Sequence, residues 1–419
     1  MKKLKPVKIL LLLKLVPFLV AGIVTFAFTT EHGKIQVIQN PADSLITGTF
    51  EIKAEFAAVG DLMCHSTQFN YARVERDSFD FSGVFEGVSG YLKNPDLLMG
   101  NFETTLSGNK YPLSGYPIFN TPDDFLSGLK DSGFDLLFTA NNHSVDRGLH
   151  GIRRTIGKFK EQGIIYRGTN FTPEGKDTVD LIDVNGVKTV VLAYSYGDNG
   201  MGNSTTNQYL NTIDSLVIKK DIAKADSLQP DVVIVYLHFG VEYQKEPNVY
   251  QKDIVERVIS YGADIILGSH PHVMQPIQYF KTKSSRLDTG FVAFSMGNFI
   301  SNQRWRYSDA GIIVNFKISK NTLTGEKKLK ELTFLPTWVF KGPTEKGKEY
   351  IIFPAEYSLK DSVPEFFTAK DIWYMKESFF DTYSISRQYD KSIKLESIFG
   401  FSESELDSIK KTVPRSDNK

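Results

Sequence analysis

The chain has 419 residues, of which 41% are hydrophobic, and its 49 basic residues balance its 49 acidic ones. This length allows one large domain or two modest ones, each able to build a core. A net charge of zero without a long basic block excludes nucleic-acid binding that rests on bulk electrostatics. The single cysteine, Cys64, excludes an intramolecular disulfide, and we expect it to be a small buried side chain before a metal ligand or nucleophile.

Residues 1–30 read as a targeting segment that stands outside the fold. Four lysines precede an apolar run of about 20 residues, which is just long enough to span a bilayer if Lys14 reaches its surface. Positive charge on this side favours an amino terminus inside and the remainder outside. A signal anchor and a cleaved signal peptide remain equal alternatives. We therefore expect a protein that is membrane-anchored and faces outside the cytoplasmic membrane, or is secreted, with a linker over residues 31–53.

Further along the chain, apolar strand-like segments alternate with helix-length spacers. The pattern predicts strands over 55–60, 96–99, 135–139, 164–166, 187–194, 231–237, 265–267 and 291–294, and helices over 84–92, 122–133, 147–162 and 250–261. Such alternation is typical of βαβ units and predicts a mainly parallel sheet covered on both faces. Late strands follow at 311–318 and 331–339. We place one domain over 54–340 and an accessory helical region over 341–419.

Polar side chains recur at or just beyond the carboxyl ends of these strands. They are Asp61, Asn101, Glu103, Asn142, His143, His238, His270 and His272. Ligands of open parallel sheets bind at this edge, and four of the chain's seven histidines fall on it, with His65 as a further candidate. Any one of these residues alone could be a capping aspartate or a core histidine. Five strand ends together favour one shared site, whose mixed oxygen and nitrogen donors suit Zn²⁺, Mn²⁺ or Fe rather than Ca²⁺.

The segments that carry these residues resemble, in order, the motif series of the CapA/PgsA family. The segments are Val59–Met63, Asn101–Thr104, Gly115–Pro117, Ala140–Asp146, His238–Tyr243, Gly268–His272 and Ser295–Phe299. That family is associated with poly-γ-glutamate capsule synthesis and has a calcineurin-like metallophosphatase fold. The resemblance covers roughly residues 54–304. It implies an α/β, layered metallophosphatase-like fold with central largely parallel or mixed sheets flanked by helices. The N-terminal membrane anchor and the C-terminal accessory region lie outside the resemblance and complete the expected architecture.

The resemblance also implies roles for individual residues. Asp61 and His272 would bind a first metal ion, Glu103 would bridge two ions, and a second ion would take Asn142, His238 and His270. His143, with Asp146, would act in catalysis as the proton donor to a leaving oxygen. Two departures stand out. Met63 occupies the histidine position of the usual D-x-H motif, for which His65 is a candidate substitute ligand, and Glu103 replaces the usual bridging aspartate.

Substrate contacts are expected from residues of the same motifs, namely Asn101, Tyr116, Glu242, Gln275 and Asn298. The loop over residues 107–120, together with Arg304 and Arg306, is expected to form a substrate rim, because arginines suit polyanions. Ordinary solvated loop charges are an equal alternative for both arginines. The partners that follow are the membrane, an anionic surface polymer or phosphoester substrate, and membrane subunits of a polymer synthase.

Three functions are compatible with this sequence. The leading hypothesis is an extracytoplasmic envelope protein that uses one or two divalent ions (Mn, Zn or Fe) as a hydrolase or transferase in poly-γ-glutamate or surface-polymer synthesis. The second is a general metallophosphoesterase of envelope phosphoesters. The third is a non-catalytic polymer-binding or export subunit, for which Met63 is the best argument. Serine-nucleophile chemistry and a phosphate-binding Walker loop lack their motifs in this sequence.

Overall fold

The computed structural model describes residues 50–360 and 363–413, which belong to one compact unit. The predicted targeting segment and most of the predicted linker lie outside the described residues. The first strand begins at Glu51, so the folded domain starts three residues before the boundary predicted from the sequence. Within the described part of the chain, no helix is both long and apolar enough for a membrane span.

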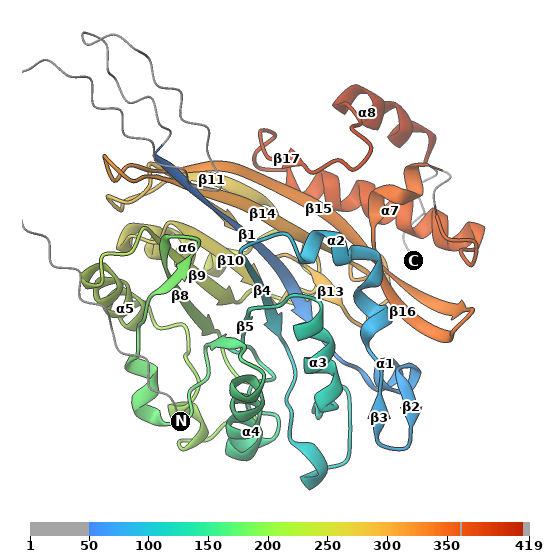
Figure 1. The fold of residues 1–419 in the computed structure, drawn as a ribbon, viewed down its shortest axis with the longest axis horizontal. Helices are drawn as coiled ribbons and strands as arrows, with labels where there is room; N and C mark the ends of the chain where they lie inside the picture. Colours follow the sequence, from blue (N-terminus) through green and yellow to red (C-terminus); the bar gives the residue numbers. More distant parts are fainter. Residues whose placement is uncertain (1–49, 361–362, 414–419) are drawn as a thin grey trace, which may run out of the picture. The chain divides into compact units, whose positions relative to one another are not determined.

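Two mixed β-sheets dominate the described residues (Figure 1). The first sheet has nine strands and the second has six. The first contains β1 Glu51–Leu62, β4 Leu97–Phe102, β5 Leu136–Phe138, β6 Ile165–Arg167, β13 Asn298–Ile300, β14 Ala310–Asn321, β15 Lys327–Thr344, β16 Gly347–Pro354 and β17 Lys394–Leu395. The second contains β7 Ile182–Val184, β8 Val187–Ser195, β9 Val232–His238, β10 Ile265–Ser269, β11 Ile277–Lys281 and β12 Thr289–Ala293.

Each sheet has a parallel part and antiparallel additions. The first runs in the order β16-β15-β14-β1-β4-β5-β6, in which β1, β4, β5 and β6 pair in parallel and β14 to β16 antiparallel. The second runs β11-β12-β10-β9-β8-β7, with antiparallel β11 and β7 at its edges. The layered α/β fold with mixed sheets flanked by helices is therefore confirmed, whereas the expectation from the strand pattern of one mainly parallel sheet covered on both faces is wrong. An apolar run buried against another sheet looks the same in sequence as one buried under helices.

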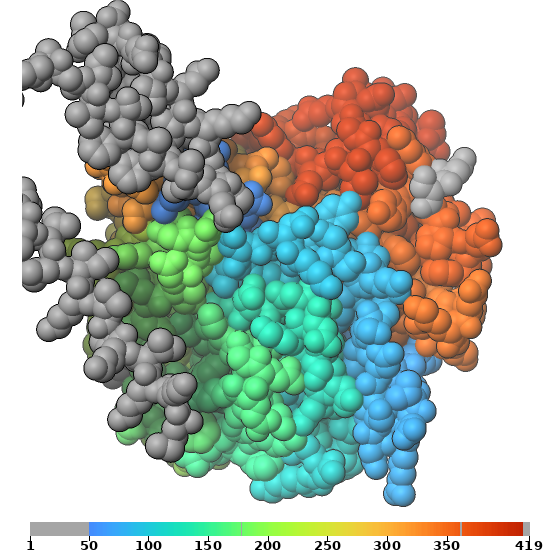
Figure 2. All heavy atoms as spheres, viewed as in Figure 1, coloured from blue at the N-terminus to red at the C-terminus, as the bar shows by residue number. Residues whose placement is uncertain are grey.

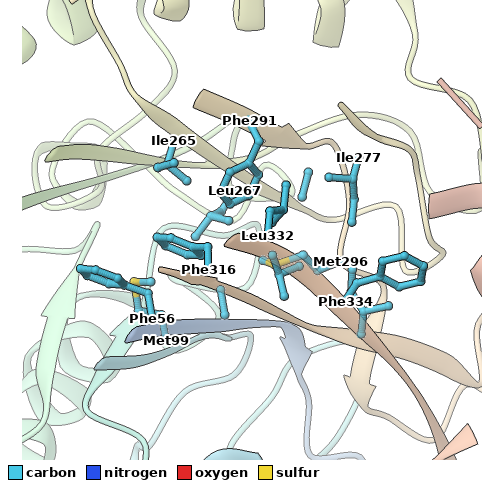
Figure 3. Packing of buried hydrophobic residues seen from close by; sticks show 14 of the residues in the cluster. Phe56, Met99, Ile265, Leu267, Ile277, Phe291, Met296, Phe316, Leu332 and Phe334 are labelled. Atoms are coloured by element: carbon cyan, nitrogen blue, oxygen red, sulfur yellow. The ribbon is translucent and has the colours of Figure 1, made fainter. Parts of the chain in front are cut away.

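The two sheets pack face to face through a shared apolar layer. Strand β1 shows the alternation that builds it, because Phe56 and Ala58 enter this layer whereas Ala57 and Val59 point to the opposite face. Phe56 stacks on Phe316 with ring centroids 4.9 Å apart, and both appear in the close view of Figure 3. This layer holds the parallel parts of the two sheets together, so their carboxyl ends are brought to one edge.

Helices cover the outer face of each sheet (Figure 1). On the first sheet, α3 (Asp123–Asp131) and α4 (Gly148–Glu161) bury Phe125 and Phe159 against the strands. On the second sheet, α5 (Ser215–Ser227) and α6 (Val249–Tyr261) do the same with Ile218 and Ile254. The result is a layered helix–sheet–sheet–helix arrangement. Further short elements include α1 Ser66–Tyr71, β2 Arg73–Glu75, β3 Ser78–Phe79 and α2 Ser89–Leu92.

The C-terminal segment belongs to the same fold. The predicted boundary at residue 340 falls inside β15, and β16 pairs along that strand. Helix α7 (Ala369–Ser386) then packs Phe379 and Tyr383 onto the apolar layer between the sheets, and α8 (Glu403–Thr412) adds Leu406. Figure 2 shows these red and orange residues lying directly against the body of the domain on this face. A separate accessory region is therefore the wrong description, because this segment completes the core.

Asp309, directly before β14, is a buried carboxyl group. It accepts a hydrogen bond from Trp338 Nε1 at 2.8 Å, and Arg304 lies over the same indole at 4.9 Å. Burial raises the pKa of Asp309 to about 6, against the opposing effect of the Arg304 charge. A carboxyl group whose pKa is raised by folding stabilises the protein fully only below its unfolded pKa, and that stability is lost as the pH rises through about 6.

We therefore expect Asp309→Asn to raise the free energy of unfolding near pH 8 by up to about 3 kcal/mol. Asparagine keeps an oxygen for Trp338 but carries no charge. Chemical denaturation of both proteins from pH 4 to pH 8 measures the effect, with the exposed Asp288→Asn as control. Equal pH dependence of wild type and Asp309→Asn would contradict the burial argument.

Candidate metal centre

Strand register places the polar side chains of both sheets at one edge. In the first sheet, Asp61 on β1 pairs with Asn101 on β4 and with Asn298 on β13. In the second, His238 on β9 pairs with Ser269 on β10, directly before the loop that carries His270 and His272. Because the strands are parallel, their carboxyl ends converge, as the sequence predicted.

Five of the predicted residues form two groups of metal-ligand type. Asp61, Glu103 and His272 make the first, and Glu103, His238 and His270 make the second. In each group the ligand atoms lie within 4.8 Å of one another, and all the side chains are buried. Glu103 belongs to both groups. This arrangement agrees with the bridging role that the resemblance implied for Glu103.

Two buried atoms in these groups lack a hydrogen-bond partner, namely Glu103 Oε1 and His270 Nδ1. The Nε2 atoms of His238 and His272 are each 3.7 Å from Glu103 Oε1, too far for a hydrogen bond. Leaving a buried polar atom unpaired costs about 1–3 kcal/mol, which a bound cation would remove. The residues present therefore fit one or two divalent ions, and their nitrogen and oxygen donors suit Zn²⁺, Mn²⁺ or Fe²⁺.

The protonation of the ligands follows from their burial. Burial, followed by the nearby charge of Asp61, raises the pKa of Glu103 well above its usual range. Burial opposes ionisation of Asp61 too, but hydrogen bonds with His272 and Asn101 hold the pKa of Asp61 below its ordinary value. Burial also lowers the pKa of His238 well below its ordinary value and that of His270 to about 3. Both imidazoles are thus neutral, which is the form that binds metal.

Asn101 and Asn298 orient the ligands rather than face a substrate. Asn101 Nδ2 donates to Asp61 Oδ1 at 2.7 Å and to Glu103 Oε2 at 2.9 Å. Asn298 Oδ1 lies 3.1 Å from His272 Nδ1. Both amides are fully buried, so the prediction that they contact substrate is wrong. Hydrogen bonds to metal ligands of this kind fix ligand orientation.

Gln275 is also not a substrate contact. Its side-chain oxygen accepts from Gln251 Nε2 at 2.7 Å and its Nε2 donates to the main-chain oxygen of Gln244 at 2.8 Å. The side chain is fully buried, so both ends of the amide are used inside the protein. Gln275 therefore ties helix α6 and the Gln244 loop to the segment after the two histidines.

The loop of the two histidines has an unusual backbone. His270 has a φ of +104° and His272 a φ of +57°, conformations that cost of order 1–3 kcal/mol at residues other than glycine. The carbonyl of Pro271 between them accepts a hydrogen bond from the Tyr243 amide at 2.7 Å. Such local strain persists where the surrounding structure enforces it, and it is common at functional sites.

His143 and Asp146 form a buried pair beside the ligand groups. His143 Nδ1 lies 2.9 Å from Asp146 Oδ2, which also accepts from the Phe119 amide at 2.7 Å. Phe119 packs edge-on against the imidazole at 4.7 Å. Asn142, the preceding residue, places Oδ1 2.8 Å from His238 Nε2 and so lies at the second ligand group, as predicted. The contacts of Asp146 and Phe119 hold the His143 ring in one orientation.

Met63, Cys64 and His65 directly follow β1, and their contacts show whether His65 replaces the histidine that the usual motif has at position 63. His65 belongs to neither ligand group, because its Nδ1 lies 3.1 Å from Gln68 Oε1 and accepts from the Asn302 amide at 3.3 Å. Met63 is buried with its sulfur 3.7 Å from Ser301 Oγ. The prediction of His65 as a substitute ligand is therefore not supported. Cys64 is buried in the apolar cluster under the first sheet, as expected of a small core residue.

Of the remaining predicted contacts, Tyr116 and Glu242 are exposed at the mouth of the site. The Tyr116 ring lies 6.3 Å from the His143 ring. The two predicted rim arginines instead contact other residues of the protein, and Arg306 stays partly exposed. Arg304 lies over Trp338, and Arg306 donates to Asp381 of α7 at 2.7 and 3.0 Å. Their predicted role is not supported, because α7 supplies Arg306 with an acidic partner and Trp338 of β15 covers Arg304, neither of which a sequence pattern could place beside them.

Several residues that reach the site were not predicted. Tyr236 places its hydroxyl 3.1 Å from His238 Nδ1, and Asn141 Nδ2 donates to Asn101 Oδ1 at 3.1 Å. The signal for Tyr236 was its position two residues before His238, which puts both side chains on one face of β9. Asn199 was also missed; its Oδ1 accepts from Asn142 Nδ2 and from the Tyr196 hydroxyl, both at 3.2 Å.

Asn199 has a testable role in metal binding. Its hydrogen bond to Nδ2 turns the oxygen of Asn142 toward the second ligand group, so Asn199→Ala frees this amide to rotate. We expect the affinity of the second metal to fall about tenfold, with the first unchanged. Titration against a competing chelator measures both affinities, and the exposed Asn109→Ala serves as control. Unchanged affinity in Asn199→Ala would show that Asn142 needs no support from this loop.

Residues 55–303 match the family described as bacterial capsule synthesis protein PGA_cap. The chain belongs to this family. The capsule biosynthesis protein CapA of Bacillus anthracis is 32% identical over 283 residues, which are 64% of this chain and 65% of that protein. The PGA biosynthesis protein CapA of Bacillus subtilis (strain 168) is 29% identical over 268 residues, 63% of this chain and 67% of that protein.

The match to the PGA_cap family ends at residue 303, so α7 and α8 lie beyond it. The chain spans just under two thirds of the B. anthracis relative. Among solved structures, the calcineurin-like phosphoesterase YfkN from Bacillus subtilis gives a TM-score of 0.40 at 13% identity, covering 79% of this chain and 98% of that one. A score of this size supports no conclusion about activity.

Proposed function

We propose that this PGA_cap family member is a metal-dependent hydrolase or transferase in the synthesis of a bacterial capsule or related surface polymer. The observation that carries the proposal is the pair of buried ligand groups that share Glu103. Family membership supplies the biological setting, since relatives are named for capsule and PGA biosynthesis. The lysine-flanked apolar run within residues 1–30 supports anchoring in the membrane with the domain outside it. An anionic polymer or phosphoester as substrate and membrane subunits of a polymer synthase as partners belong to the same proposal.

The ligand groups suit chemistry at a phosphoryl centre. Metal ions bound there would polarise phosphoryl oxygens and activate a water molecule. The protein's own residues then have separate tasks. Asp61, Glu103, His238, His270 and His272 would hold the metal ions, and Asn101 orients the carboxylates of Asp61 and Glu103 through its two hydrogen bonds. In hydrolysis, the oxygen of water bonds to phosphorus and one proton of that water passes to solvent, while the bond from phosphorus to the leaving oxygen breaks. His143 donates its proton to the leaving oxygen and is protonated again from solvent. The contact of Asp146 with His143 Nδ1 orients the ring for this proton transfer.

The test is turnover by the full-length protein loaded with Mn²⁺, Zn²⁺ or Fe²⁺, on phosphomonoesters, phosphodiesters and γ-glutamyl peptides. We expect at least one class to be turned over, and chelation or His270→Ala to abolish the reaction. Bound metal measured in the same samples shows whether the centre is loaded. A loaded protein that turns over none of the three classes would contradict the proposal.

A second candidate is a non-catalytic polymer-binding or export subunit. Met63 favours it, because Met63 occupies the position of the usual histidine ligand and its sulfur contacts Ser301 instead. The first ligand group therefore consists of Asp61, Glu103 and His272. In that case polymer binding would be the same in wild type and in His270→Ala, and neither would show metal-dependent turnover.

A further inference from the structure

Four exposed aromatic side chains surround the mouth of the metal centre, and we call them the aromatic collar. They are Tyr116, Tyr196, Tyr243 and Trp305, with exposed fractions of 70%, 41%, 43% and 51%. Each stands on a different connection: before α3, after β8, after β9 and after β13. Large aromatic surfaces gathered at one opening cost solvation free energy unless a ligand covers them.

The collar lies directly against the ligands and the proton donor. The Tyr196 ring is 4.6 Å from the His270 ring, and the Tyr243 ring is 6.1 Å from that of His272. Trp305 extends the surface outward, 5.2 Å from Tyr243. Tyr116 stands on another side, next to His143. Since His143 faces the leaving oxygen in the proposed reaction, Tyr116 lies on the leaving-group side.

The edges of the collar carry uncharged polar groups and one carboxylate. The Tyr196 hydroxyl donates to Asn199 Oδ1 at 3.2 Å, and Gln303 Nε2 donates to the Tyr243 hydroxyl at 3.3 Å. The collar therefore offers flat apolar faces with hydrogen-bonding groups between them.

The basic residues of the neighbouring segments already have partners in the protein, although Lys245 is exposed and Arg306 is partly exposed. Arg147 donates to Ser114 and to the main-chain oxygen of Ile118, and Arg306 donates to Asp381. Lys245 lies over the Tyr307 ring at 4.0 Å. A polyanionic chain is recognised through cations placed for its carboxylates or phosphates. The collar offers it the carboxylate of Glu242 instead.

We propose that the aromatic collar binds a hydroxylated sugar ring in the leaving group, so that the substrate class is a sugar phosphoester. A sugar ring has apolar C–H faces, which suit Tyr116 and Tyr243, and hydroxyl edges, which suit Asn199, Gln303 and Glu242. The phosphoryl group would then lie at the ligand groups within reach of His143. This inference rests on the proposed metal-dependent function and names its substrate.

The test compares two phosphate esters of equal charge, glucose 1-phosphate with a ring and glycerol 3-phosphate without one. Binding to the metal-loaded full-length protein is followed by calorimetry and by tryptophan fluorescence. We expect Tyr116→Ala to lower the affinity for glucose 1-phosphate roughly tenfold and to leave the affinity for glycerol 3-phosphate unchanged. Tyr116→Phe keeps the ring and should bind both as wild type does. Tyr374→Ala, an exposed tyrosine of α7 away from the site, is the control.

Equal effects on both esters, or no effect on either, would overturn the proposal. The proposal would also be overturned if a poly-γ-glutamate oligomer displaced glucose 1-phosphate at a concentration lower than that of glucose 1-phosphate itself. Failure of the proposed function gives a different result: ring-dependent binding without turnover of any ester. Turnover of ring-bearing and ring-free esters at the same rate, unchanged in Tyr116→Ala, would sink the inference and leave the metal-dependent function intact.

Discussion

A Glu103→Gln variant is expected to lose metal from both ligand groups at once. Glu103 is the one residue that the two groups share, and its Oε1 has no hydrogen-bond partner among the described residues. Glutamine has nearly the same shape but carries no charge and only one oxygen. Removing a group that merely orients a ligand weakens metal binding 10- to 100-fold, so loss of this shared ligand should cost on the order of 100-fold or more for each ion.

The same substitution has the opposite effect on the metal-free protein. Burial raises the pKa of Glu103, so without metal its contribution to stability is complete below the unfolded pKa near 4.5 and is lost as the pH rises toward the folded pKa. Glu103→Gln removes this loss. With chelator at pH 8, the variant should therefore melt at a higher temperature than wild type, whereas with metal wild type should be the more stable.

Metal content and melting temperature, each measured with and without chelator, check both parts. Glu86→Gln, a change at an exposed glutamate, serves as the control and should behave as wild type. If Glu103→Gln retained its metal, Glu103 would not be a bridging ligand. If it melted lower than wild type in chelator, the carboxyl group would have a structural role beyond the metal centre.

The strand ends of this fold were predictable because parallel strands leave a clear trace. A buried apolar run that stops at a polar residue marks both the strand and its edge, and Asp61, His238 and the His270 loop were all found this way. The division into two sheets left no such trace. The alternation of β1 buries one face under helices and the other against the second sheet, and both environments select the same residues.

Ligand identity was easier to predict than the role of each amide. Carboxylates and imidazoles are rarely buried without a partner, so their collection at one edge already indicated a metal site. An asparagine can face a ligand, a substrate or the main chain equally well. Asn101 and Asn298 were therefore predicted to contact substrate, whereas they hydrogen-bond to the ligand residues, and Asn199 was not predicted at all. Its contact with Asn142 joins residues 57 positions apart, which no local pattern reveals.

The second large effect is expected at His143. If this residue donates the proton to the leaving oxygen, His143→Gln should lower kcat by 10²- to 10⁴-fold, a typical contribution of general acid catalysis. Metal content should not change, because His143 belongs to neither ligand group. Asp146→Asn should cost less, since it weakens only the contact that orients the ring. The double variant should resemble His143→Gln alone, because the pair acts as one unit.

Leaving groups of different basicity separate proton donation from a structural effect. A nitrophenolate leaves without a proton, whereas an alkoxide needs one, so His143→Gln should lose far more activity on an alkyl ester than on a nitrophenyl ester. The control is His150→Gln on α4, whose ring contacts the main-chain oxygen of Ser107 outside the site. Equal losses on both esters would refute the proton-donor role. A fall in bound metal in His143→Gln would instead assign this histidine to the support of the ligand groups.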